Sequence, residues 1–76
     1  MIREHDRVVL TAAVADAGLV TGDVGTVVHA YDGGQAFEIE FMALDGHTIV
    51  VATVEVSQVR PVTGGKITHA RQLAAR

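Results

Sequence analysis

A glycine-punctuated corner that runs straight into a β-branched segment places the strongest constraint on how this chain can fold. Gly22 and Gly25 bracket two residues, and glycine accepts the positive φ angles and close backbone contacts that other residues resist. Residues 26–28 are all β-branched, which favours a half-buried strand over a helix. The pattern predicts a sharp corner that leads into a strand ending near Tyr31.

Two further turns follow this strand. Asp32-Gly33 and Asp45-Gly46 each lie between apolar segments, and Asp-Gly in such a position is a strong hairpin signal. The segment between them, residues 35–44, alternates apolar and acidic side chains as a strand with one buried face does. The apolar set is Phe37, Ile39 and Phe41, and the acidic set is Glu38 and Glu40.

The Asp45-Gly46 turn sets a register if it forms a two-residue loop, because Leu44 then pairs with His47. Side chains directly opposite each other in an antiparallel pair share a face. The predicted core pairs are Phe41 with Val50, Ile39 with Ala52, and Phe37 with Val54.

The loop at residues 32–34 decides which face of the preceding strand is buried, because side chains alternate with a period of two. An even-length loop puts Thr26, Val28 and Ala30 in the core, and an odd-length loop inverts the assignment. We prefer the even case. It leaves Val27, His29 and Tyr31 on the outer face, with His29 opposite or beside Glu38.

The remaining segments complete a five-stranded chain. Residues 7–11 and 58–62 read as short strands, the second bounded by Pro61, which cannot donate to an interior ladder. Residues 12–20 read as a loop with one helical turn, anchored in the core by Leu19, and residues 54–57 as a single helical turn. This arrangement predicts an all-β fold, a small five-stranded SH3-like barrel over residues 1–62.

Most of the chain, from Asp6 to Val62, resembles the uncharacterised bacterial family known as domain of unknown function 4926. The resemblance is carried by the segments 6–10, 18–19, 22–28, 38–41, 44–46 and 58–62. It implies a bacterial source but brings no activity with it. The shorter segment 22–27 is similar to the glycine-led strand of KOW modules and of SH3-like accessory subunits in photosynthetic and hydratase complexes.

Composition narrows the class of protein. Seventy-six residues without cysteine form one small domain that has no disulfide. All nine carboxylates precede Val56, so residues 1–62 carry three Arg against nine acids, a charge of −6, while residues 63–76 carry +3. An acidic body is a poor surface for nucleic acid. No apolar run is long enough to span a bilayer and no signal peptide is visible, so we expect a cytoplasmic protein without a membrane partner.

The chemistry-bearing residues do not form a catalytic, metal or cofactor site. The four histidines, His5, His29, His47 and His69, lack ligand spacing, so we predict neither a metal nor a cofactor. Glu38 and Glu40 read as a solvated strand face, and Ser57 has no histidine at catalytic spacing. The residues predicted to act only in turns are Gly22, Asp23, Gly25, Asp32, Gly33, Asp45 and Gly46.

An outward-facing apolar patch is the strongest functional feature. The predicted register places Met42 opposite Ile49 and leaves Leu44 and Val51 beside them, outside the core. A contiguous exposed apolar patch usually marks an interface, although bent barrel strands or the loop 11–20 can also cover such residues. The predicted interaction surface comprises Met42, Leu44, Ile49, Val51, Val27 and Tyr31.

The C-terminal segment 63–76 begins with Gly64-Gly65 and is basic. It is predicted to be a disordered tail or a short helix capped by Thr68, because so short a helix is marginal in isolation. We therefore expect a non-catalytic SH3-like protein-interaction module, an accessory, regulatory or antitoxin-like partner of another bacterial protein. We expect it to be a homodimer, or a monomer that dimerises weakly until its partner arrives. A KOW-like nucleic-acid-binding module is the alternative, disfavoured by the acidic body.

Overall fold

The computed structural model describes residues 2–62, and the predicted tail 63–76 lies outside the described residues. The described chain is mostly β, a five-stranded antiparallel sheet with strand order β4-β3-β2-β1-β5. The strands are β1 (Arg7–Leu10), β2 (Val24–Tyr31), β3 (Ala36–Met42), β4 (Thr48–Glu55) and β5 (Val59–Pro61). The bounds predicted for β1, β2, β3 and β5 differ from these by two residues at most.

Two short 3₁₀ turns occupy the places where single helical turns were predicted. The first, η1 (Ala15–Ala17), lies in the long loop between β1 and β2, and Leu19 behind it is buried as expected. The second, η2 (Val56–Gln58), joins β4 to β5, the two edge strands of the sheet. Its start is capped by Gln58, whose side-chain oxygen accepts the Glu55 N–H at 2.8 Å.

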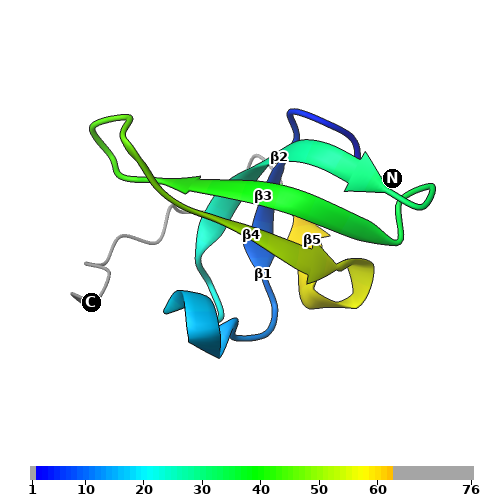
Figure 1. Cartoon of the computed structure of the whole chain (residues 1–76), viewed down its shortest axis with the longest axis horizontal. Helices are drawn as coiled ribbons and strands as arrows, with labels where there is room; N and C mark the ends of the chain where they lie inside the picture. The colour runs from blue at the N-terminus through cyan, green and yellow to red at the C-terminus, as the bar shows by residue number, and fades with distance from the viewer. Residues whose placement is uncertain (1, 63–76) are drawn as a thin grey trace.

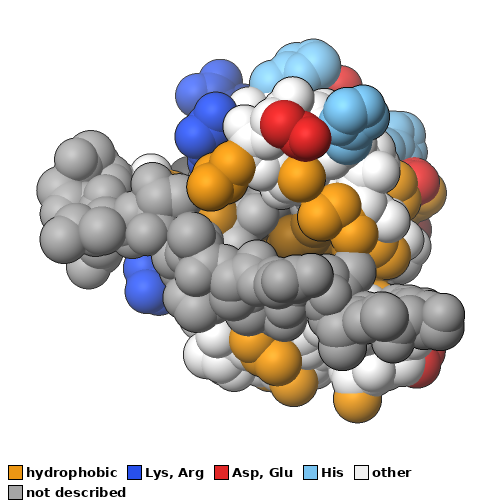
Figure 2. Space-filling view, turned by 90° about the vertical axis from the view of Figure 1, so that its left-hand side faces the viewer, with side chains coloured by type: hydrophobic (Ala, Val, Ile, Leu, Met, Phe, Trp, Pro, Cys, Tyr) orange, Lys and Arg blue, Asp and Glu red, His pale blue; other side chains and the backbone are white. Residues whose placement is uncertain are grey.

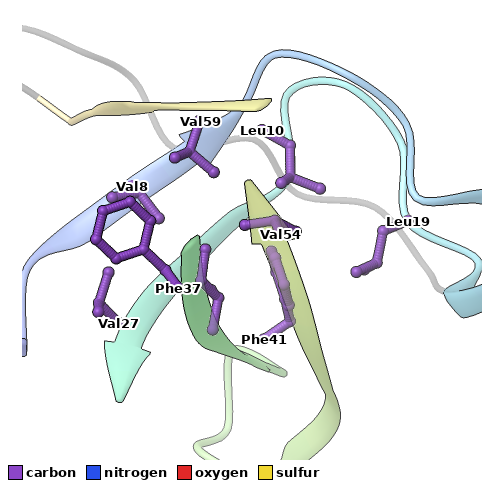
Figure 3. Packing of buried hydrophobic residues seen from close by; sticks show 9 residues of the cluster. Val8, Leu10, Leu19, Val27, Phe37, Phe41, Val54 and Val59 are labelled. Atoms are coloured by element: carbon purple, nitrogen blue, oxygen red, sulfur yellow. The ribbon is translucent and has the colours of Figure 1, made fainter. Parts of the chain in front are cut away.

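The sheet is strongly curved. In Figure 1 the β3–β4 hairpin lies in front of β1 and β5. Figure 3 shows Val54 of β4 and Val59 of β5 pointing into the same interior space. The core cluster comprises Val8, Leu10, Leu19, Val27, Phe37, Ile39, Phe41, Val54 and Val59.

The glycine corner forms as predicted, and its two glycines are required for different reasons, one for its backbone conformation and the other for space. Gly22 has a φ of 99°, a left-handed conformation that favours glycine. Gly25 is needed for space, because β3 passes directly over it: a Cβ there would lie 2.9 Å from the Glu40 carbonyl oxygen. Asp23 is buried, and its carboxylate accepts the Val20 N–H at 3.0 Å, which ties the corner to the preceding loop.

The predicted pairing of β3 with β4 is confirmed over most of its length. Phe37 pairs with Val54, Ile39 with Ala52, and Phe41 with Val50. The two-residue loop is wrong, because the register shifts beyond Phe41 and Met42 pairs with Thr48. Ile49 is the extra residue of this β-bulge, and the turn spans residues 43–47, closed by the Ala43 N–H bonding to the His47 carbonyl oxygen at 2.8 Å.

The pairing of β2 with β3 corrects the predicted faces of β2. Four residues, 32–35, separate the strands, so the even-length loop is right, and Ala30 pairs with Phe37. A second register shift between Val27 and His29 makes Val28 an extra residue. One inserted residue reverses the alternation before it. Val27 is therefore fully buried against Ile39, whereas Val28, predicted to be in the core, is 40% exposed.

Candidate interaction surface

Four large apolar side chains at one end of the β3–β4 hairpin remain open to solvent, and we call them the outer apolar cluster. Met42 ends β3, Leu44 lies in the turn, and Ile49 and Val51 belong to β4. Their exposed fractions are 46%, 85%, 48% and 46%, respectively. Figure 2 views the molecule from the side of this hairpin turn and shows hydrophobic side chains beside acidic and histidine side chains. The exposure predicted for these four residues is therefore observed.

Strand geometry explains why these side chains point outward. Val51 pairs with Glu40, and both lie on the face opposite the core pairs Ile39–Ala52 and Phe41–Val50. Ile49 does not lie across from Met42 as predicted, because the bulge pairs Met42 with Thr48. The bulge keeps Ile49 exposed and strengthens the local twist. The four side chains are therefore exposed as predicted, but Met42 pairs with Thr48 and not with Ile49.

Two other residues of the predicted surface behave differently. Val27 was predicted to be part of the surface, and this is wrong: its side chain is 0% exposed and belongs to the core cluster. Tyr31 is exposed as predicted, at 37%, but it ends β2 and pairs with Ala36, at the other end of β3 from Met42. Only Met42, Leu44, Ile49 and Val51 are therefore grouped at one end.

A polar group surrounds Tyr31. Its hydroxyl donates to Glu38 Oε1 at 2.7 Å, and its ring meets the His29 ring edge to face with centroids 4.4 Å apart. The hydrogen bond to Glu38 favours the protonated phenol and raises the pKa of Tyr31, with partial desolvation and the Glu38 charge adding to the effect. His29 pairs with Glu38 across the strands, as predicted, and its Nδ1 lies 3.5 Å from Glu4 Oε2.

The hairpin turn beside the cluster carries its own local contacts. Asp45 Oδ1 accepts the His47 N–H at 3.1 Å, and the His47 Nδ1 lies 3.1 Å from the same oxygen. The backbone hydrogen bond, followed by the imidazole contact, lowers the pKa of Asp45. Gly46 completes the turn at a φ of 95°. Asp45 and Gly46 therefore act as turn residues, as predicted.

The first hairpin loop uses its predicted turn residues in the same way. Asp32 has a φ of 51° and Gly33 a φ of 66°, so both adopt left-handed conformations. The Gly34 N–H donates to the Tyr31 carbonyl oxygen at 2.9 Å and closes the loop. Aspartate tolerates this conformation better than most residues, which explains its place before glycine.

The described residues offer no grouping suited to metal binding. Within residues 2–62, no three His, Asp or Glu side chains come together in a way that could hold an ion. Glu38 and Glu40 have separate hydroxyl partners, Tyr31 and Thr48, respectively. His69 lies outside the described residues. Over residues 2–62 no helix is long and apolar enough to cross a membrane.

Sequence reasoning missed the exposure of Val28, because no residue in 26–30 signals a bulge. It also did not single out the free edge of β4. That edge is visible only once the strand order places β4 at the end of the sheet.

The fold and its surface define a class: a small antiparallel β-domain with a compact apolar core and an exposed apolar hairpin end. The chain belongs to the family described as Domain of unknown function (DUF4926), whose model matches residues 4–61. No curated protein and no solved structure matches the chain.

Proposed function

We propose that this chain is a non-catalytic SH3-like protein-interaction module that serves as an accessory, regulatory or antitoxin-like partner of another protein in the bacterial cytoplasm. The observation that carries the proposal is the outer apolar cluster, four large apolar side chains exposed together at one hairpin end. Monomeric proteins seldom leave such a patch without a use. A partner that covers it removes apolar surface from water, the main driving force of association.

Several features support the SH3-like barrel as the finer description of the fold. The strands form an antiparallel meander with β5 added beside β1, and a 3₁₀ turn links the two edge strands. Side chains from both edge strands, Val54 and Val59, belong to one core cluster. In such a barrel a single layer of core side chains is enclosed by the curved sheet itself.

The absence of catalysis is part of the proposal. Asp23 is buried, but its carboxylate is bonded to the Val20 N–H within the glycine corner. The other titratable side chains described above lie toward the surface, in contact with neighbouring polar groups. The largest buried side chains are all aliphatic or phenylalanine, which suits a packed interior more than a substrate site. We expect binding, through the outer face, to be the whole activity of residues 1–62.

The test is partner capture from a native bacterial host with tagged full-length protein and quantitative mass spectrometry. Leu44→Lys is the informative variant, because Leu44 is 85% exposed and its replacement leaves the core intact. Val20→Lys is the matched control, with the same charge change at an apolar residue that is 42% exposed and lies before β2. The proposal predicts that Leu44→Lys loses a protein that wild type and Val20→Lys retain. Equal capture by all three would refute it.

A further inference from the structure

We propose that the free edge of β4 pairs with the β4 edge of a second copy of this chain, antiparallel and centred on Val51. The two sheets would then join across a two-fold axis into one continuous sheet. The inference rests on the proposed function in one respect, because it takes the outer apolar cluster to be a protein-contact surface. Within that cluster, the second copy would contact Ile49 and Val51.

The backbone of β4 leaves an edge available for such pairing. The Val56 N–H donates to the Gln35 carbonyl oxygen at 2.9 Å, and hydrogen-bonded pairs alternate along an antiparallel ladder. Val50, Ala52 and Val54 therefore direct their backbone groups to β3. Val51 and Thr53 direct their N–H and C=O groups to the far side, where the described part of the chain places no other strand.

The two edges of the sheet differ in how they are protected. Natural edge strands usually resist pairing through shortness, proline, lysine or other charges. The edge strand β5 has three residues, including Arg60 and Pro61. β4 has eight residues, and its only charged or proline residue is Glu55 at the end. The one protective device on β4 is the bulge at Ile49, which lies near the turn. β4 is thus the edge fitted for pairing.

Side chains select the register. With Val51 opposite Val51 of the second copy, Ile49 lies opposite Thr53 and the β-branched outer side chains meet each other. The same register carries Glu55 past Ile49 to the end of the paired segment, where β4 of the second copy begins at Thr48 and the carboxylate stays beside solvent. Centring on Thr53 instead would set Glu55 against Val51, an unfavourable match. The apolar pairs and the position of Glu55 therefore both favour Val51 as the centre.

Disulfide cross-linking tests this register directly. The chain contains no cysteine, so a single introduced cysteine can cross-link only to its copy in a second chain. Hydrogen-bonded antiparallel pairs have Cα atoms about 5.5 Å apart, within the roughly 4.4–6.8 Å range of a disulfide. Val51→Cys should therefore cross-link to itself under oxidised glutathione. Ile49→Cys is the matched control, at 48% exposed against 46% for Val51. In this register two copies of residue 49 are four residues out of line, about 13 Å apart.

We expect Val51→Cys to form covalent dimer at least about tenfold faster than Ile49→Cys, because pairing raises the effective concentration of the two thiols. A mixture of Ile49→Cys and Thr53→Cys should yield the mixed dimer in preference to either homodimer. Circular dichroism melts of the reduced variants establish that each is folded. Equal rates for Val51→Cys and Ile49→Cys, or fastest cross-linking by Thr53→Cys alone, would overturn the proposal.

Failure of the edge pairing and failure of the proposed function can be told apart. If Val51→Cys does not cross-link while Leu44→Lys still loses its partner, the edge inference is wrong and the interaction module stands. In the opposite case, cross-linking follows the predicted order while wild type, Leu44→Lys and Val20→Lys all capture the same proteins. The edge pairing is then correct, and the proposal that the outer apolar cluster binds a different protein is wrong. Residue 44 lies in the turn, outside β4, so its substitution leaves the paired edge untouched.

Discussion

Gly25 lies so close to Ile39 that a Cβ built on its backbone would come within 2.5 Å of the Ile39 Cγ2 atom. The same Cβ would lie 2.9 Å from the Glu40 carbonyl oxygen and 2.9 Å from Phe41 Cε2. A backbone oxygen cannot move aside as a flexible side chain can. The close approach of β2 to β3 therefore depends on a residue without a side chain at position 25.

Gly25→Ala should lower the free energy of unfolding by at least about 2 kcal/mol, since overpacking forces neighbours out of place. Urea denaturation measures this value. Gly33→Ala is the control: nothing lies within 4 Å of its added Cβ, and only the φ of +66° opposes it. It should cost about 1 kcal/mol. A smaller loss for Gly25→Ala than for Gly33→Ala would contradict the tight approach.

Phe41→Ala should destabilise the domain by about 3–5 kcal/mol, because it opens a cavity in a core whose other members, apart from Phe37, are aliphatic. Phe41 is 5% exposed and belongs to the core cluster. Ile49→Ala, in the same hairpin but 48% exposed, should cost about 1 kcal/mol or less. Thermal and urea unfolding of both variants measure the difference. Similar losses at the two positions would mean that the assigned core face is wrong.

The single tyrosine makes its own titration observable by ultraviolet absorbance, since the chain has no tryptophan. Because Tyr31 donates a hydrogen bond to Glu38, its pKa lies above the ordinary value of 10.0. A raised folded-state pKa means that the stabilisation is fully present below the unfolded pKa and is lost as pH rises through the folded one.

Glu38→Gln should bring the Tyr31 midpoint back toward the ordinary value, because it removes the carboxylate that favours the protonated phenol. Glu40→Gln is the matched control, a carboxylate on the same face whose hydroxyl partner is Thr48. It should leave the midpoint near that of wild type. A wild-type midpoint at or below the ordinary value, or equal shifts in both variants, would show that the contact with Glu38 is not formed in solution.

Nucleic acid should bind weakly, with a Kd of about 10⁻⁵ M or weaker at physiological salt. The reason is the charge of residues 1–62, three Arg against nine carboxylates. Fluorescence anisotropy with labelled RNA and duplex DNA measures the affinity, and deletion of residues 63–76 should abolish what binding remains. Tight binding that survives the deletion would favour a KOW-like nucleic-acid-binding module.

The sequence was a good guide to the β3–β4 hairpin because two signals agreed there. The alternation of Phe37, Ile39 and Phe41 with glutamates marked one face, and the Asp45-Gly46 turn fixed the approximate partner strand. Each predicted core pair is present. The corner at Gly22 and Gly25 could also be predicted from the sequence. Gly22 has a positive φ, and Gly25 has no space for a Cβ, so both positions favour glycine.

The sequence does not predict the two β-bulges. A bulge inserts one residue and reverses every side chain beyond it, yet Val28 and Ile49 are ordinary β-formers with no local mark of irregularity. Val27 was therefore assigned to the outer face although it lies in the core. The outer apolar cluster is predicted correctly despite the bulge at Ile49, because Val51 keeps its place beside Glu40 and Ile49 remains 48% exposed.

Light scattering coupled to size-exclusion chromatography, run on full-length wild type and Ile49→Lys, tests the central claim that the outer apolar cluster is a contact surface. Wild type should show a concentration-dependent mass that rises above the 8.0 kDa of one chain. Ile49→Lys should remain at the monomer mass, lose partner capture and melt close to wild type, because Ile49 is 48% exposed. Unfolding of Ile49→Lys would place Ile49 in the core, and unchanged mass, capture and melting would show that the cluster is ordinary surface.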